Sequence, residues 1–186
     1  MHRLACFSAA AVIAAAPIFA IAADAPKPPA KPAAKEDTTP KSLGGANGWS
    51  AYSAGGKANL VCYVVGKPTR SEPADPKRSP VDLQVTHRPV EKALNVVSFE
   101  LGYAAKSGSS ADLDIDGKKF SLFTNKNAAW TSNAASDKIV TAALSKGKKA
   151  VIAATPERGA NTTDTYILEG FARALALADK ACGIKR

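Results

Sequence analysis

Residues 58–66 read ANLVCYVVG, an apolar run that predicts a buried β-strand. A run that is apolar on both faces is typical of a strand covered on each side. Side chains alternate along a strand, so Leu60, Cys62 and Val64 share one face. Cys62 is therefore expected to point into the core of a β-rich fold.

Further strands are predicted on both sides of this run by a period of two. Residues 112–124 predict a hairpin whose two-residue turn is Asp116-Gly117. A long proline-punctuated loop is expected over residues 67–80. The other expected strands cover residues 81–88, 94–101, 149–155 and 163–169. This pattern predicts a mainly β, antiparallel β-sandwich-like domain.

The first of two short helices is expected to start at Ser136 as the N-cap and to end at a glycine. Its apolar stripe would be formed by Ile139, Val140 and Ala143. The second, over residues 170–182, has apolar residues at spacings of three, four and seven. That stripe includes Cys182, so we expect the C-terminal helix to pack on the sheet.

The start of the chain predicts export. A short basic start and an apolar run over residues 4–21 are typical of a signal peptide, with cleavage near Ala22. A retained membrane anchor and a lipoprotein cysteine at Cys6 are the alternatives. Residues 1–22 are thus the expected leader, residues 23–42 a Pro/Ala/Lys-rich flexible linker, and residues 43–186 a single globular domain.

Processing leaves two cysteines, Cys62 and Cys182, and two cysteines in an exported chain are usually bonded. Cys62 lies on the inward face of a predicted strand, and Cys182 lies on the apolar stripe of a predicted helix. Their expected burial supports a disulfide between them. Removal of Arg3 leaves 24 basic against 16 acidic residues, a net charge of +8. This balance favours anionic partners such as envelope polysaccharide, lipid head groups or acidic proteins. No nucleic-acid module and no transmembrane segment are expected in the processed, periplasmic or secreted protein.

Several motifs together resemble the invasion-associated locus B family of small exported alphaproteobacterial proteins, over about residues 47–183. They are Gly48-Trp49, Val61-Cys62-Tyr63-Val64, Val85-Thr86-His87-Arg88-Pro89, Ala128-Ala129-Trp130 and residues 158–171. The resemblance implies a periplasmic or surface-associated β-rich domain, named for a role in host-cell invasion. It offers no catalytic residues to carry over.

Catalytic and metal-binding patterns are sparse. His87 is the only histidine left after processing, and a hydrolase would need it together with a serine and a carboxylate such as Asp164. No Gly-x-Ser-x-Gly motif occurs, so we expect a structural histidine and keep a His87 hydrolase as the alternative. Asp112, Asp114 and Asp116 copy the opening of a calcium loop, but position twelve is Phe123 and not Glu. No metal or cofactor is expected.

Two tryptophans and three polar residues form a possible binding surface. Arg158, Asn161 and Asp164 belong to a turn-prone segment that is either a recognition loop or a plain hairpin connection. Trp49 and Trp130 are either core anchors or part of the same surface. The sequence therefore predicts a non-catalytic exported module that binds an envelope component or a protein.

Overall fold

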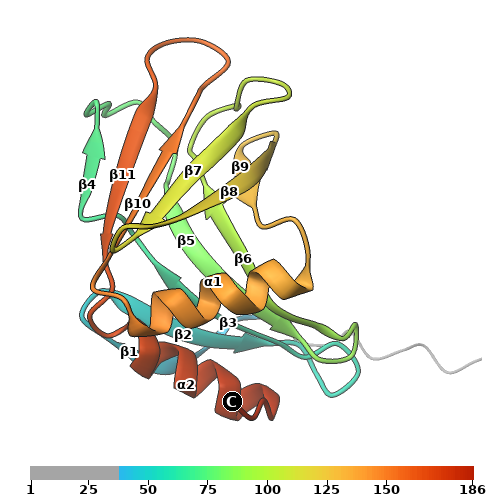
Figure 1. The fold of residues 1–186 in the computed structure, drawn as a ribbon. Coiled ribbons are helices and arrows are strands. Elements are labelled where there is room, and N and C mark those ends of the chain that lie inside the picture. The colour runs from blue at the N-terminus through green and yellow to red at the C-terminus, as the bar shows by residue number, and fades with distance from the viewer. Residues whose placement is uncertain (1–37) are drawn as a thin grey trace, which may run out of the picture. The chain divides into compact units, whose positions relative to one another are not determined.

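The computed structural model describes residues 38–186, and the predicted leader and most of the predicted linker lie outside this part. Eleven strands form one sheet in the order β1-β2-β3-β5-β6-β9-β8-β7-β10-β11-β4, and neighbouring strands run antiparallel (Figure 1). The strands are β1 (Lys41–Ala46), β2 (Trp49–Ala54), β3 (Val61–Gly66), β4 (Arg70–Glu72), β5 (Asp82–Arg88), β6 (Ala93–Glu100), β7 (Ser110–Ile115), β8 (Lys118–Asn125), β9 (Ala128–Trp130), β10 (Lys149–Ala154) and β11 (Thr162–Ile167).

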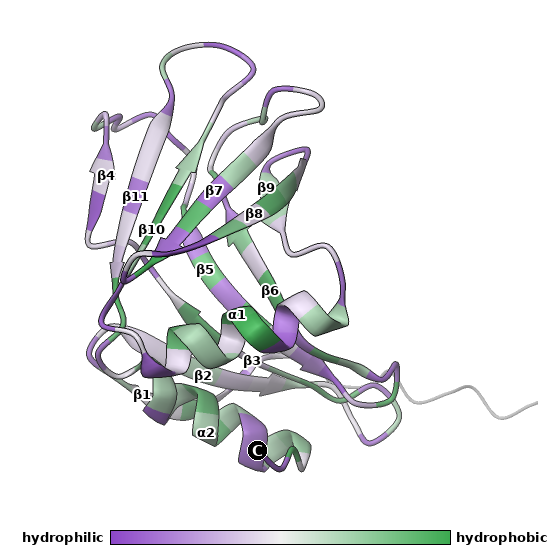
Figure 2. Cartoon of the chain, in the orientation of Figure 1, coloured by the Kyte–Doolittle hydropathy of each residue, from purple (hydrophilic) through white to green (hydrophobic). Residues whose placement is uncertain are grey.

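The sheet curls so that its two halves face each other across one core, and the predicted sandwich-like β fold is confirmed (Figure 1). Tyr166 of β11 meets Phe99 of β6 at a ring-centroid distance of 5.8 Å and Trp49 of β2 at 6.4 Å. Figure 2 shows the alternation of polar and apolar residues along β5 and β7 that produces one inward face.

The outer face of β3 differs from the expectation. Cys62 and Val64 are buried in the core, whereas Tyr63 and Val65 on the opposite face are half-buried. Tyr63 stacks on Tyr52 of the neighbouring β2 at 5.3 Å. The apolar run was predicted to be covered on both sides, but its outer side chains are shielded mainly by their neighbours along the sheet.

The hairpin of β7 and β8 has the predicted turn. Ile115 pairs with Lys118, so Asp116 and Gly117 are the two loop residues, with φ of 49° and 89°. Positive φ at both positions is the geometry in which Asp-Gly is favoured, because it matches the twist of the strands. Asp116 also accepts hydrogen bonds from the backbone of Lys148 and Lys149.

Two helices complete the domain, α1 (Ala134–Lys146) and α2 (Phe171–Cys182). Helix α2 packs on β1, β2 and β3 with the predicted apolar stripe, and the structure contains the predicted disulfide between Cys62 of β3 and Cys182. The bridge joins residues 120 positions apart. Neither helix in this part of the chain is long and apolar enough to cross a membrane.

Helix α1 starts earlier and faces differently from the prediction. Its N-cap is Asn133, whose side chain accepts from the backbone N–H of Ser136 at 3.0 Å. Ile139, expected in the buried stripe, is 51% exposed. The buried face instead includes Asp137 and Thr141, because both bind the free edge of β6 beyond β9.

Candidate binding site

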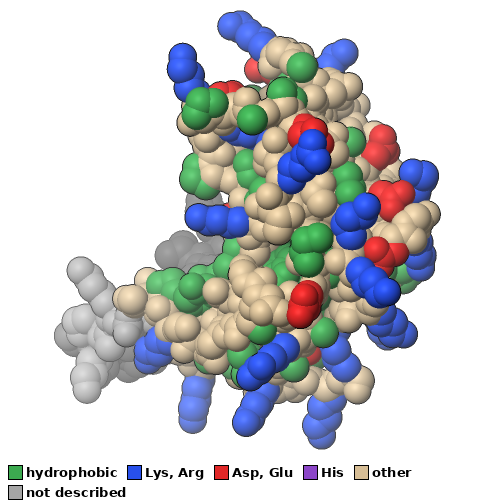
Figure 3. Space-filling view, turned by 90° about the vertical axis from the view of Figure 1, so that its left-hand side faces the viewer, with side chains coloured by type: hydrophobic (Ala, Val, Ile, Leu, Met, Phe, Trp, Pro, Cys, Tyr) green, Lys and Arg blue, Asp and Glu red, His purple; other side chains and the backbone are tan. Residues whose placement is uncertain are grey.

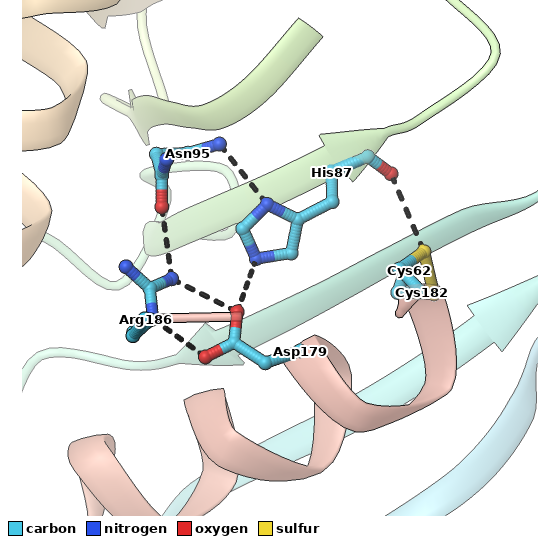
Figure 4. Close-up of a disulfide and its surroundings, with 6 residues drawn as sticks. All are labelled: Cys62, His87, Asn95, Asp179, Cys182 and Arg186. Carbon is cyan, nitrogen blue, oxygen red and sulfur yellow. Dashed lines mark hydrogen bonds and ion pairs between the residues drawn. A yellow bond between two sulfur atoms is a disulfide. The ribbon is translucent and has the colours of Figure 1, made fainter. Parts of the chain in front are cut away.

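His87 lies in a buried cluster next to the disulfide (Figure 4). Its strand neighbour on β3 is Cys62. The ring Nδ1 accepts a hydrogen bond from the backbone N–H of Asn95 at 3.0 Å, so Nε2 must carry the ring proton. Nε2 lies 3.1 Å from Oδ1 of Asp179 on α2.

Arg186 closes this cluster from the C-terminus. It donates to both carboxylate oxygens of Asp179 at 2.5 and 2.9 Å, and to the side chain of Asn95 at 2.8 Å. Burial alone would raise the pKa of Asp179, but the hydrogen bonds from His87 and Arg186 and the charge of Arg186 hold that pKa below its usual 3.8.

The His87 hydrolase interpretation is wrong. The ring is completely buried, whereas a catalytic base has to face an open cleft that admits substrate. The two ring nitrogens contact the backbone N–H of Asn95 and the carboxylate of Asp179, and neither of these partners is a serine or threonine hydroxyl. His87 instead ties β5 to β6 and α2.

Two residues of the predicted binding surface are buried. Trp49 is 3% exposed: its Nε1 donates to the carbonyl of Ile167 at 2.9 Å, and its ring meets Phe171 edge-on at 4.9 Å. Gly66 leaves room for this ring, because a Cβ there would lie 2.5 Å from it. Trp49 is thus a core anchor, which was the other interpretation open from the sequence.

Asp164 is 1% exposed and forms a buried ion pair with Arg78. Both guanidinium Nη atoms donate to the carboxylate, at 2.9 and 2.7 Å, and Nε donates to the carbonyl of Leu101. This fork geometry satisfies both charges in the interior. Asp164 therefore cannot contribute to an exposed surface directly, but it fixes Arg78 beneath one.

That surface is a hollow of about 260 Å³ at the end of the molecule where three loops meet. The loops connect β4 to β5, β6 to β7, and β10 to β11, and they lie at the top of Figure 1. The hollow is lined by Pro73, Asp75, Lys77, Arg78, Gly102, Tyr103, Pro156, Arg158, Gly159, Ala160 and Thr162. We call it the loop-end hollow.

The floor of the loop-end hollow is rigid and polar. The Arg78 guanidinium lies 4.8 Å from the centre of the Tyr103 ring, and the Tyr103 and Thr162 hydroxyls are 2.5 Å apart. Burial is the main cause that raises the pKa of Tyr103. Around this floor stand the exposed cations Lys77 and Arg158 and the carboxylate of Asp75.

The remaining predicted residues are divided between two places. Arg158 lines the loop-end hollow, and Asn161 is exposed in the same connection without lining it. Trp130 is half-buried on the outer face of β9, beside Phe123 of β8, which is 48% exposed. The structure thus does not bring Trp130 into the same site as Arg158.

Lys77, Tyr103 and Thr162 line the loop-end hollow but are not among the predicted site residues. Lys77 belongs to the proline-rich stretch 67–80, which was predicted as a loop but not as part of a site. The sequence could not show that the loops of Lys77 and Tyr103 meet the β10–β11 connection, because that contact depends on the order of strands in the sheet.

A larger, open hollow of about 770 Å³ lies along β8, β7, β10 and β11. Its lining mixes acidic and basic residues, and Asp114 is already paired with Lys119 at 3.1 Å. Asp114 also accepts from the backbone N–H of Gly117, which lowers its pKa. Asp114 and Asp116 of the calcium-like sequence therefore stabilise the predicted hairpin and its junction with β10.

Comparison with known proteins gives one match, to a protein family. Residues 49–179 match the family model described as Invasion associated locus B (IalB) protein. The chain therefore belongs to the IalB family, which is not a known family of enzymes. No curated protein and no solved structure matches the chain.

Proposed function

We propose that this protein is an exported binding module whose loop-end hollow holds an acidic group, a carboxylate or a phosphate, of an envelope component or partner protein. The observation that carries the proposal is the placement of Lys77 and Arg158 around the fixed floor of the hollow. Because the floor is already held by the Arg78–Asp164 pair, binding an anion there needs no rearrangement of this part of the site.

Export is supported by the leader-like residues 1–22, by the disulfide and by family membership. Within the hollow, Arg78 is neutralised by Asp164 and so acts mainly as a support, while Arg158 is the exposed guanidinium. A guanidinium suits carboxylates and phosphates because its N–H groups match their paired oxygens. The predicted anionic partner would thus be held by side chains from three loops.

The test is a calorimetric and NMR titration of the purified protein with acetate, inorganic phosphate and a uronic acid. We expect saturable binding of at least one of these anions, with shifts confined to the three loops, and loss of binding in Lys77→Gln/Arg158→Gln. Arg173→Gln/Lys180→Gln on α2 is the matched control, because it removes the same charge elsewhere. The proposal would be refuted if none of the three anions bound the protein saturably, or if the two double variants bound the anion equally well.

A further inference from the structure

The charges of the two helices are segregated by burial. Helix α1 contains one carboxylate, Asp137, and α2 contains one, Asp179; each is only 7% exposed. All the basic residues of both helices are exposed: Lys138, Lys146, Arg173 and Lys180. The outward sides of α1 and α2 therefore carry positive charge without a carboxylate of their own.

The buried carboxylates are fully engaged on the inner side. Asp137 accepts from the backbone N–H of Val97 at 2.8 Å and from the Thr131 hydroxyl. Asp179 is held by His87 and Arg186. Neither carboxylate can turn outward to neutralise the exposed cations without leaving these buried donors unpaired.

The positive surface extends past the ends of the helices. Lys185 is exposed after α2, and Lys148 and Lys149 are exposed after α1. The exposed acids nearby are Asp116, which accepts hydrogen bonds from the backbone of Lys148 and Lys149, and Glu169, which precedes α2. Figure 3 shows Lys and Arg side chains projecting along the lower edge of the molecule, where α2 lies. We call the exposed side of α1 and α2, with these three lysines, the basic helix face.

The basic helix face combines exposed cations with an exposed apolar side chain. No residue of α1 or α2 lines either hollow, and of the three added lysines only Lys149 does, in the larger hollow. The cations Arg173 and Lys180 are seven residues apart and so lie on the same side of α2, with the small Ala176 exposed between them. On α1, Ile139 is 51% exposed next to Lys138. Exposed cations attract anionic lipid head groups, and an exposed apolar side chain beside them can enter the interface.

We propose that the basic helix face docks the protein on an anionic phospholipid bilayer. The lysines and arginines would contact the head groups, and Ile139 would enter the interface. The disulfide and the Asp179 cluster hold α2 on the sheet, so the face exists before docking and needs no rearrangement. The loop-end hollow lies at the other end of the molecule in Figure 1 and would point away from the bilayer. This proposal does not rest on the function proposed for that hollow.

The experiment measures sedimentation of the exported, purified protein with vesicles of phosphatidylcholine, with or without phosphatidylglycerol; intact mass verifies that the leader is absent. We expect binding only to the vesicles with phosphatidylglycerol, and weaker binding at higher salt. Each cation removed near such a surface lowers affinity about fivefold, so Arg173→Gln/Lys180→Gln should bind roughly 25-fold more weakly. Lys77→Gln/Arg158→Gln, with the same net charge, should bind like the wild type.

A second measurement uses Ile139→Ser, which changes an exposed side chain and leaves the charge unaltered. We expect weaker vesicle binding with an unchanged salt dependence, because the apolar contribution is not screened. The proposal is overturned by absence of vesicle binding, by equal loss in the two double variants, or by soluble polygalacturonate binding the face as tightly as vesicles do. Loss of anion binding at the loop-end hollow with intact vesicle binding would count only against the proposed function.

Discussion

Asp137, Asp164 and Asp179 are less than a tenth exposed, and each is held by hydrogen bonds from other parts of the chain. Removing a carboxylate from water is costly unless charges or donors replace the lost hydration. The three aspartates therefore fix pairs of elements in defined positions. Asp137 holds α1 on β6, Asp164 holds the β4–β5 loop on β11, and Asp179 holds α2 on β5.

Asp179 should make stability depend on pH. Its pKa is lower in the folded state than in the unfolded chain, so the carboxylate stabilises the fold above the usual value of 3.8. This contribution is lost as the pH falls below that value through the folded pKa. We expect Asp179→Asn to lower the free energy of unfolding by about 2 kcal/mol at neutral pH. The difference in free energy of unfolding between this variant and the wild type, measured by urea titration, should become smaller in acid. A difference that does not change with pH would contradict the lowered pKa of Asp179.

The pair of Arg78 and Asp164 should show the cost of an unpaired buried charge. We expect Arg78→Met to lower the free energy of unfolding by about 3 kcal/mol, because Asp164 then loses its counter-ion in the interior. The double variant Arg78→Met/Asp164→Leu should regain much of this loss, since neither charge remains. Urea unfolding of the three proteins measures the difference, and a double variant less stable than Arg78→Met would argue against the explanation.

Helix α1 covers an open strand edge. Strand β9 pairs with β6 only from Ser98 to Glu100, so the backbone before Ser98 has no strand partner on that side. The Asp137 side chain binds the N–H of Val97 there, and the Thr141 hydroxyl donates to the carbonyl of Asn95 at 3.3 Å. Free strand edges invite pairing with other chains, and a covering helix prevents it.

Replacing Asp137 should open this edge locally. We expect Asp137→Ala to cost about 2 kcal/mol, because the buried N–H of Val97 loses its acceptor. Amide hydrogen exchange should become faster at Val97 and in α1, while exchange in β10 stays slow. Lys138→Ala, an exposed change in the next position, is the control and should leave exchange at Val97 unaltered.

The disulfide should contribute to the stability of the whole folded part. It closes a loop of 120 residues, for which the chain-entropy model gives about 5 kcal/mol, although measured values are often smaller. We expect Cys62→Ala/Cys182→Ala to unfold at a clearly lower urea concentration, and reductant to shift the wild type in the same direction. Equal midpoints with and without reductant would show that the bridge adds nothing to stability.

Strands β1, β2, β4 and β9 were not predicted. The hairpin of β1 and β2 nevertheless has a turn sequence that could have indicated it. Between β1 and β2 the residues Asn47 and Gly48 have φ of 50° and 84°, the same hairpin geometry as Asp116-Gly117. Asn-Gly is a strong hairpin pattern, but the flanking residues are mostly Gly, Ala and Ser, so the alternation is weak. Strands β4 and β9 have three residues each, too few for a periodic pattern.

At the scale of the whole molecule, the described residues form one core, and β1 begins at Lys41, two residues before the predicted start of the domain. We propose that this part folds by itself. A chain that starts at residue 38 should unfold in one cooperative transition, with a free energy within about 0.5 kcal/mol of a chain that starts at residue 23. A clearly less stable shorter chain would show that the predicted linker contributes to the fold.

The sequence alone determined the antiparallel β class, the Asp116-Gly117 turn, the packing stripe of α2 and the disulfide partners. These features depend on local periodicity, on the chirality of a tight turn, or on the count of cysteines outside the predicted leader. Only the tertiary structure decided which polar residues are buried and which loops meet. Asp137, Asp164 and His87 are hydrophilic types whose burial is stabilised by partners far along the chain, and the loop-end hollow exists because strand order brings three distant loops to one end.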